Sequence, residues 1–368
     1  MATRGEYPYR PDYAVLPGDS LAEVLESRSM TQADLANRMG RPLKTINEII
    51  KGKAAITADT ALQLERVLGV PATFWINLER NYREALARKK DQDRLKKQLK
   101  WLGQFPVRAM VKSGWIKARG GVEQLQDLLR FFGVASPEQW KDVWGSAGVA
   151  YRRSRLFESD PGAVAAWLRQ GEQQAQGLRC APYEPRRFRR LLGEIRGLTS
   201  RPPDVFQLEL VRLCAESGVA VVFVPELPKL RISGAARWIS PRKALIQLSL
   251  RYKTNDHLWF SFFHEAGHVL LHGKRSVFID DGKGSDGEEA EANTFAANLL
   301  VPPAIYGRLI ATRPPSEPAV FQASKEAGVA PGIIVGRLQH DGLLRYDQMN
   351  HLKERFTWVP VKSEQAAA

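Results

Sequence analysis

Apolar residues recur every three or four positions through the first 90 residues, the spacing expected when a helix buries one face. The pattern predicts five helices, which begin at Asp19 or Ser20, after the capping residue Thr31, at about Pro42, at Ala58 and at about Pro71. Gly40 suits the end of the second helix, so that a short turn separates it from the third. The sequence therefore predicts an all-α N-terminal region with a helix-turn-helix.

Helical spacing continues from residue 91 to about residue 204, where the chain is rich in basic residues. Five of the nine tryptophans lie in this region, at Trp101, Trp115, Trp140, Trp144 and Trp167. We interpret the region as a folded helical domain with these rings in its core, because buried aromatic rings contribute large apolar areas. No motif in it points to a reaction.

Continuous apolar runs replace the helical spacing after residue 205, and such runs are typical of buried strands. The sequence predicts strands over residues 219–224, 234–238 and 244–250, with helices before and after them. This order favours an α+β layer arrangement. The expected multidomain chain comprises an all-α helix-turn-helix domain over 1–90 with an arm over 1–18, a basic helical middle domain over 91–204, and an α+β domain over 205–368.

The chain has 368 residues and a formal net charge of +14, and most of the positive excess lies between residues 91 and 205. A basic surface fits contacts with nucleic acid or with an acidic partner, although a solvated basic face gives the same count. No apolar run is long enough to span a bilayer, and the first residues lack the apolar core of a secretion signal. Cys180 and Cys214 lack the spacing of a disulfide framework or zinc knuckle. We expect a cytoplasmic protein without a membrane partner.

The segment His264-Glu265-Ala-Gly-His268 lies within an apolar helical stretch. Residues four apart share one face of a helix, so both imidazoles can bind one metal ion while Glu265 stands beside it. Two imidazoles and a carboxylate leave a fourth position on zinc for water, whose pKa falls to about 7. Glu265 is the residue expected to take the proton of this water. The segment therefore predicts a catalytic zinc site.

The third zinc ligand is expected from the acidic helix that follows a Gly/Asp/Lys-rich loop at 280–287. Glu288, Glu289 and Glu291 all lie at the start of this helix. Asn293 lies one turn beyond Glu289 on the same face, where its amide can orient a histidine or the carboxylate. We therefore favour Glu289 as the ligand and rank Glu288 last.

His272 lies eight residues beyond His264, a distance of about 12 Å along a helix, which is too far for both to share one ion. A role beside the metal ligands and a purely structural role remain alternatives for His272. The oxyanion of the transition state also needs a hydrogen-bond donor. The sequence leaves four alternatives for this donor: Tyr252, Arg251, His272 and His340.

The motif from Phe263 to His272, together with Glu289-Ala-Glu-Ala-Asn-Thr-Phe-Ala-Ala-Asn-Leu-Leu-Val-Pro302, resembles the ImmA/IrrE family of zinc metallopeptidases. The resemblance covers about residues 205–310. It implies regulated cleavage of a repressor or antitoxin-like protein rather than general proteolysis. The site that it implies has Zn²⁺ held by His264, His268 and Glu289, with Glu265 as the base.

The third predicted helix, residues 42–51, combines an apolar face with a polar face, as a DNA-recognition helix must. Its apolar positions are Ile46, Ile49 and Ile50. The residues expected to reach bases or phosphates, from this helix and its neighbours, are Gln32, Lys44, Thr45, Asn47, Lys51 and Lys53. A helical bundle of similar shape that binds protein is the alternative.

Residues 14–90 resemble the Xre superfamily of regulators, and the continuation from Ala55 to Leu78 resembles HigA/VapI-type antitoxins more narrowly. The chain departs from these families at Arg41-Pro42, where relatives place a small capping residue such as serine. The resemblance implies a lambda-repressor-like fold and binding to double-stranded operator DNA. Such units bind palindromic sites as dimers, so we expect a homodimer.

Together these features predict a HigA-type antitoxin-like transcriptional regulator that carries a zinc-dependent endopeptidase domain. Its expected partners are operator DNA and a regulatory protein that the peptidase cleaves. The alternative is a non-catalytic antitoxin or repressor whose zincin-like domain only binds a toxin or a signal.

Overall fold

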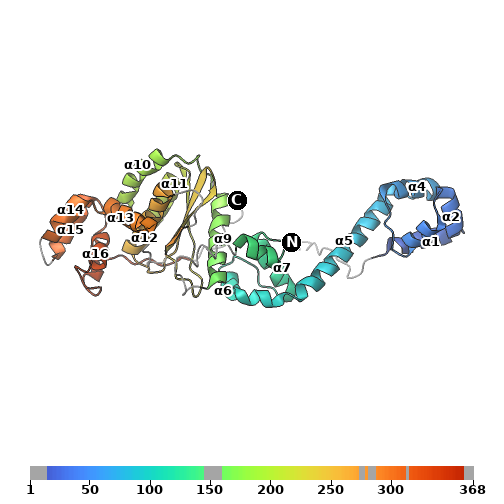
Figure 1. Ribbon diagram of the computed structural model, residues 1–368, viewed down its shortest axis with the longest axis horizontal. Helices are drawn as coiled ribbons and strands as arrows, with labels where there is room; N and C mark the ends of the chain where they lie inside the picture. Colours follow the sequence, from blue (N-terminus) through green and yellow to red (C-terminus); the bar gives the residue numbers. More distant parts are fainter. Residues whose placement is uncertain (1–14, 145–159, 273–277, 281–286, 312–314, 360–368) are drawn as a thin grey trace, which may run out of the picture. The chain divides into compact units, whose positions relative to one another are not determined.

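The computed structural model describes residues 15–144, 160–272, 278–280, 287–311 and 315–359. The chain divides into two compact units, Met1–Leu99 and Lys100–Ala368, which are described separately (Figure 1). Most of the predicted arm over 1–18 and of the predicted loop at 280–287 lies outside the described residues. The predicted boundary between the middle and C-terminal domains falls within the second unit.

The first unit contains the five predicted helices around one apolar core. They are α1 (Pro17–Ser27), α2 (Gln32–Met39), α3 (Leu43–Ile50), α4 (Ala58–Leu68) and α5 (Ala72–Lys96). Each helix contributes a fully buried side chain to the core, namely Leu21, Leu35, Ile46, Leu64 and Trp75. The all-α prediction for this region is confirmed. The apolar faces of the five helices pack together in one core.

The helix-turn-helix has one strongly capped helix and one without a side-chain cap. Thr31 accepts a hydrogen bond from Asp34 N (3.1 Å), and Asp34 accepts one from Thr31 N (3.0 Å), so α2 begins with a capping box. Gly40 ends α2 with φ +65°, as predicted. By contrast, Pro42 precedes α3 and provides no side-chain cap. The start of α3 therefore depends on packing against its neighbours.

The second unit is built on a four-stranded sheet in the order β1-β3-β2-β4. Its strands are β1 (Val219–Phe223), β2 (Gly234–Ser240), β3 (Lys243–Leu248) and β4 (Phe278–Asp280). β1 runs parallel to β3, whereas β2 is antiparallel to both β3 and β4. The three predicted strands are present. The three residues of β4 are too few for a periodic signal, so the sequence did not predict this edge strand.

Helices cover both faces of the sheet (Figure 1). Successive strand residues point to opposite faces. On β3, Ile246 and Leu248 join the apolar core around α12 (Asn255–Leu271), whereas Gln247 points to α9 (Pro161–Gly177) and donates from Nε2 to Trp167 O (2.6 Å). Trp167 in turn donates from Nε1 to Val224 O (3.0 Å). A helix from the predicted middle domain thus forms one layer of the sheet structure.

The remaining helices of the second unit surround these layers. They are η1 (Leu99–Gln104), α6 (Val107–Lys112), α7 (Gly121–Phe132), α10 (Pro185–Arg196), η2 (Gly197–Ser200), α11 (Pro203–Ala215), α13 (Gly287–Leu300), α14 (Pro303–Ala311), α15 (Glu317–Ala327), α16 (Pro331–His340) and η3 (Asn350–Leu352). Four of the five tryptophans in 91–204 are buried, and Trp115, which is partly exposed, stacks on Phe131. The prediction that these rings belong to a core is confirmed for the four. The fold class is α-rich with an α+β layered C-terminal region, as predicted.

Both cysteines are free thiols, and Cys214 is fully buried in the apolar core. Within the described ranges, no helix is long and apolar enough to cross a membrane.

Candidate functional site

The predicted metal-binding segment lies on α12, which the structure buries on nearly every side. Trp259, Phe262 and Phe263 are fully buried around it, so the helix forms the centre of the second unit. His264 and His268 are each 1% exposed, and Glu265 is fully buried. An ionisable side chain in such a place is costly unless it is paired or binds a metal ion. The burial therefore already separates these three residues from ordinary surface groups.

Glu289 on α13 brings its carboxylate against both histidines. His264 Nε2 lies 3.0 Å from His268 Nε2. Glu289 Oε2 lies 3.2 Å from His264 Nε2, and Glu289 Oε1 lies 3.3 Å from His268 Nε2. These three residues are the group in the described part of the chain whose ligand atoms could share one metal ion. The two helices thus bring together residues 25 positions apart in the sequence.

The donor atoms fit a tetrahedral zinc site. Ligand atoms that lie 2.0–2.1 Å from a tetrahedral ion are about 3.3 Å from one another, close to the separations among His264, His268 and Glu289. Asn293 Oδ1 lies 2.9 Å from His264 Nδ1. The amide oxygen can only accept, so it holds the proton on Nδ1 and leaves the Nε2 lone pair directed at the group. Two neutral nitrogens and a carboxylate form a ligand set that zinc prefers.

Ionisation states in this group favour metal binding. Burial acts to raise the pKa of Glu289, but the neighbouring imidazoles of His264 and His268 outweigh it and lower the pKa to about 2. Burial lowers the pKa of His268, against the opposing effect of its hydrogen bond to Glu289. A carboxylate that stays ionised and an imidazole that stays neutral near pH 7 are the forms that bind a metal cation.

The two other acidic residues at the start of α13 do not contact the histidine pair. Glu288 is exposed, whereas Glu291 Oε2 lies 3.3 Å from His272 Nε2. His272 ends α12, and its Nδ1 lies 2.9 Å from His268 Nδ1. Of the two roles left open for His272, the contact places it beside a histidine of the group and outside the group itself. It links His268 to Glu291.

Two glycines for which the sequence predicted no role allow other groups of the site to approach closely. A Cβ on Gly234, the first residue of β2, would lie 2.7 Å from Glu265 Oε1. A Cβ on Gly267 would lie 3.2 Å from Ala292 Cα and from Phe295 Cδ1 on α13. Glycine is unfavourable inside strands and helices, so its presence there signals a close approach of another group. The sequence shows a glycine in a predicted strand and another in a predicted helix, but it does not show which group approaches each of them.

The four alternatives for the oxyanion donor lie in different places. Tyr252 stacks on His257 at 4.1 Å, and Arg251 NH1 donates to Arg231 O (2.6 Å). His340 lies at the end of α16 with its side chain 82% exposed and contacts Asp341. Of the four, His272 is the one whose side chain lies against the histidine pair, with its Nδ1 2.9 Å from His268 Nδ1. The choice among these donors stays open.

The predicted DNA-contact residues lie on the surface of the first unit. Lys44, with its side chain 84% exposed, projects from α3 and lies 3.9 Å from Glu48. An exposed pair of this kind is worth little, so Lys44 can exchange it for a phosphate. Lys51 and Lys53 are exposed just after α3, and the other three residues are partly exposed: Gln32, Thr45 and Asn47. The polar face of α3 is therefore accessible while Ile46 and Ile49 anchor the helix.

Comparison with known proteins identifies both functional regions. Residues 21–75 match the helix-turn-helix family model, and residues 219–335 match the model of the IrrE N-terminal-like domain. The second match contains α12 and α13, and so it includes the whole histidine and glutamate group.

Two curated relatives each match about a fifth of the chain. The HTH-type transcriptional regulator YddM of Escherichia coli, described as uncharacterized, is 32% identical over 73 residues, which are 20% of this chain and 78% of that protein. The virulence-associated protein I of Dichelobacter nodosus is 37% identical over 70 residues, 19% of this chain and 65% of that protein.

Solved structures with similar sequences include an addiction module antidote protein of the HigA family from Coxiella burnetii. It is 35% identical and covers 23% of this chain and 92% of its own, with a TM-score of 0.22. The antitoxin HigA of Pseudomonas aeruginosa, solved with the higBA promoter, is 30% identical and covers 22% of this chain and 90% of its own, with a TM-score of 0.22.

The fold and these matches define a DNA-binding helix-turn-helix regulator with an IrrE-like peptidase domain. The chain belongs to the HTH-type transcriptional regulators through its helix-turn-helix region, and it also carries a region that matches the IrrE N-terminal-like domain.

Proposed function

We propose that this protein is a transcriptional regulator whose second unit is a zinc-dependent endopeptidase that cleaves a regulatory partner protein. The observation that carries the proposal is the convergence of His264, His268 and Glu289 within the IrrE-like domain. Their separations and their ionisation fit zinc, and Glu265 lies on the same helix beside them. Among the described residues no fourth protein ligand joins the group, which supports a hydrolytic site rather than a structural one with a closed coordination shell.

The roles of the residues follow from their positions. When bound, zinc would polarise the carbonyl group of the substrate and lower the pKa of a water molecule. His264, His268 and Glu289 would hold the ion, and Asn293 keeps the His264 ring in the required tautomer. Glu265 accepts the proton of the attacking water on a carboxylate oxygen and returns it to the departing amine. Gly234 leaves room for that carboxylate, because any larger residue would place Cβ against it.

The test compares wild-type protein with the Glu265→Gln variant, each loaded with zinc and incubated with lysate of the organism that encodes it. Protein N-termini that form during the incubation are then mapped. We expect new termini with wild type and none with the variant. The control is the zinc content of both proteins. It should be equal, because residue 265 is not one of the three ligands and glutamine preserves the shape of the glutamate side chain.

An absence of new termini with wild type that holds one zinc per chain would overturn the peptidase. The second unit would then be a binding module for a toxin or a signal. Equal cleavage by the Glu265→Gln variant would instead remove Glu265 from its role as base.

For the first unit, we propose binding to a palindromic operator by a homodimer through the exposed face of α3. Support comes from the helix-turn-helix match and from the exposure of Lys44, Lys51 and Lys53. Selection of DNA from a random pool with the purified chain is expected to enrich an inverted repeat. Enrichment of no sequence above background would contradict operator binding.

A further inference from the structure

Helix α10 presents an unusual concentration of positive charge on the second unit. It contains five arginines and one acidic residue, Glu194, and its apolar residues Phe188, Leu191, Leu192 and Ile195 are buried. The buried side leaves Arg186, Arg189 and Arg190 exposed in one stripe, since positions i, i+3 and i+4 are neighbours on a helix. A stripe of three guanidinium groups is therefore open to solvent.

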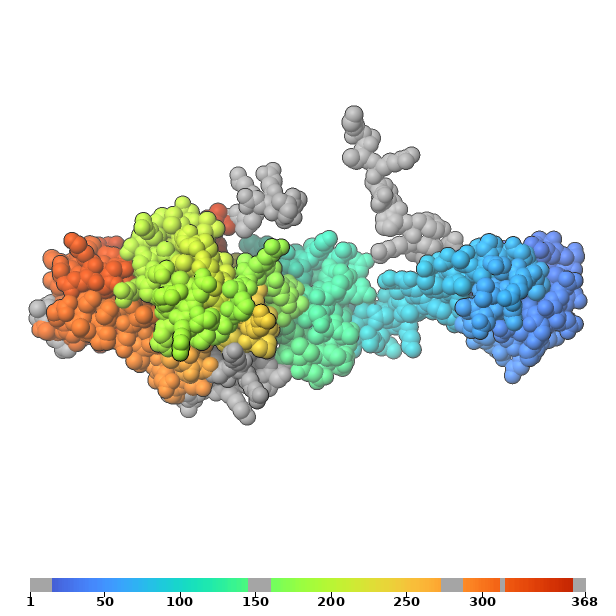
Figure 2. Space-filling model, turned by 90° about the horizontal axis from the view of Figure 1, so that it is seen from above, coloured from blue at the N-terminus to red at the C-terminus, as the bar shows by residue number. Residues whose placement is uncertain are grey.

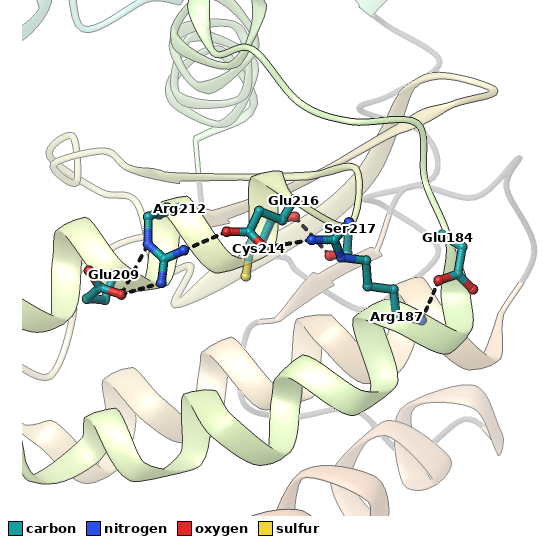
Figure 3. A network of polar contacts seen from close by, with 7 residues as sticks. All are labelled: Glu184, Arg187, Glu209, Arg212, Cys214, Glu216 and Ser217. Atoms are coloured by element: carbon teal, nitrogen blue, oxygen red, sulfur yellow. Dashed lines mark hydrogen bonds and ion pairs between the residues drawn. The ribbon is translucent and has the colours of Figure 1, made fainter.

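The arginines around α10 and α11 fall into two classes. On the side that faces α11, Arg187 pairs with Glu216 (2.7 Å), and Arg212 pairs with Glu216 (2.5 Å) and Glu209 (2.7 Å) (Figure 3). In contrast, no ion pair links Arg186, Arg189 or Arg190 to a carboxylate in the described parts of the chain. The arginines between the two helices are thus paired with carboxylates, whereas the outward stripe has no carboxylate partner among the described residues.

An apolar groove lies beside this stripe. It has a volume of about 490 Å³, and the residues that line it are Leu271, Ala290, Glu291, Thr294 and Phe295. The guanidinium carbon of Arg189 lies 5.8 Å from the centre of the Phe295 ring, so the stripe borders the groove directly. In Figure 2 the light-green surface, which includes α10, lies against the orange surface of the helices that follow α12.

The groove also lies close to the metal group. Leu271, 41% exposed, immediately precedes His272, which contacts His268. Glu291, the acidic residue of the groove, contacts His272 rather than an arginine of the stripe. The surface therefore combines unpaired positive charge, an apolar depression and nearness to the proposed reaction centre.

We propose that the Arg186, Arg189 and Arg190 stripe and the adjoining groove form a docking surface for an acidic peptide segment that also carries an apolar side chain. The guanidinium groups bind its carboxylates, and the groove takes the apolar side chain. This inference deepens the proposed function, on which it rests, by naming the chemistry of the substrate segment. The apolar groove favours a peptide over a nucleic acid, because a phosphate backbone gains contacts from arginines and none from an apolar pocket.

The experiment measures binding without turnover. The probe is a fluorescein-labelled peptide, Asp-Glu-Asp-Leu-Phe-Glu-Asp, added to the full-length, zinc-loaded Glu265→Gln protein, and anisotropy reports the Kd. Substitution of all three residues, Arg186→Ala, Arg189→Ala and Arg190→Ala, is expected to raise the Kd at least about tenfold, because charged contacts are lost. Replacement of Leu-Phe by Ser-Ser in the probe is expected to raise the Kd severalfold.

The matched control removes three positive charges elsewhere on the same unit, by Lys112→Ala, Lys117→Ala and Lys325→Ala. These lysines are exposed and have no ion pair among the described residues. We expect the control variant to bind the probe within about twofold of the parent, since screened charges at a distance contribute little. An equal loss in both triple variants would reduce the effect to net charge and overturn the docking surface.

Three further outcomes overturn the proposal. They are an unchanged Kd in the arginine variant, equal binding of a probe in which lysines replace the acidic residues, and a DNA duplex that binds more tightly than the peptide and is lost in the arginine variant. The failure of cleavage is a separate result. If the probe binds as expected while wild type cleaves nothing, the docking surface stands and the proposed peptidase fails.

Discussion

The two functional regions of this protein differ in how they place their polar side chains. In the first unit, the residues expected to bind DNA lie on the surface of a small helical bundle, with Lys44 84% exposed. In the second unit, His264 and His268 are each 1% exposed, and Glu289 comes from a different helix. The surface residues can change without effect on the core, whereas the buried group depends on the packing of α12 against α13.

The difference predicts that substitutions in the buried group will affect more than one property, and that those on α3 will affect only one. His264→Ala is the strongest test, because it removes one of three ligands and leaves the partly buried Glu289 carboxylate beside a cavity. We expect loss of stoichiometric zinc, loss of any cleavage and a lower unfolding temperature. Metal analysis and thermal unfolding measure these effects.

His340→Ala is the matched control, since this histidine is in the same unit with its side chain 82% exposed. It should leave both the zinc content and the unfolding temperature unchanged. Full zinc retention by His264→Ala would contradict the three-ligand group.

Asn293→Ala tests whether the amide orients His264 rather than merely filling space. Removal of such an orienting partner typically weakens metal binding by about 10-fold to 100-fold. We expect a loss in this range in a competition titration with a chelator. Asn293→Asp, which retains an acceptor 2.9 Å from His264 Nδ1, is expected to recover most of the affinity. Equal affinity in all three proteins would leave Asn293 without this role.

Lys44→Ala and Thr45→Ala test the predicted DNA-binding surface on α3. A lost base contact costs about 1–3 kcal/mol in binding free energy, and a lost phosphate contact weakens binding to all sequences alike. We expect weaker binding to the selected DNA and an unchanged unfolding temperature, because Lys44 is exposed and Thr45 is only partly buried. Undiminished affinity and specificity in both variants would mean that α3 does not read DNA.

Thr31→Ala is predicted to have the smallest effect and to act on stability alone. Loss of the cap on α2 costs about 1 kcal/mol of the free energy of unfolding. Hydrogen bonds from Thr31 hold the pKa of Asp34 below its ordinary value of 3.8. The capping box is therefore fully stabilising above about pH 4, and its contribution is lost as the pH falls through the lowered pKa. Urea unfolding between pH 3 and pH 7 should show a smaller dependence on pH in the variant.

Sequence alone determined the features that depend on neighbours within a few positions. Thr31 and Gly40 mark the ends of α2 because capping is local, and His264 and His268 share a face because a helix repeats every 3.6 residues. The five helices of the first unit were predictable for the same reason.

Only the tertiary structure decided which distant residues meet. Glu288, Glu289 and Glu291 are close in sequence, and the packing of α13 on α12 at Gly267 directs Glu289 to the histidines and Glu291 to His272. Packing likewise placed α9 on the sheet, Gly234 against Glu265, and the α10 arginines beside the groove next to α13. Periodicity defines the face of one element, but contacts between elements depend on how close their backbones can approach.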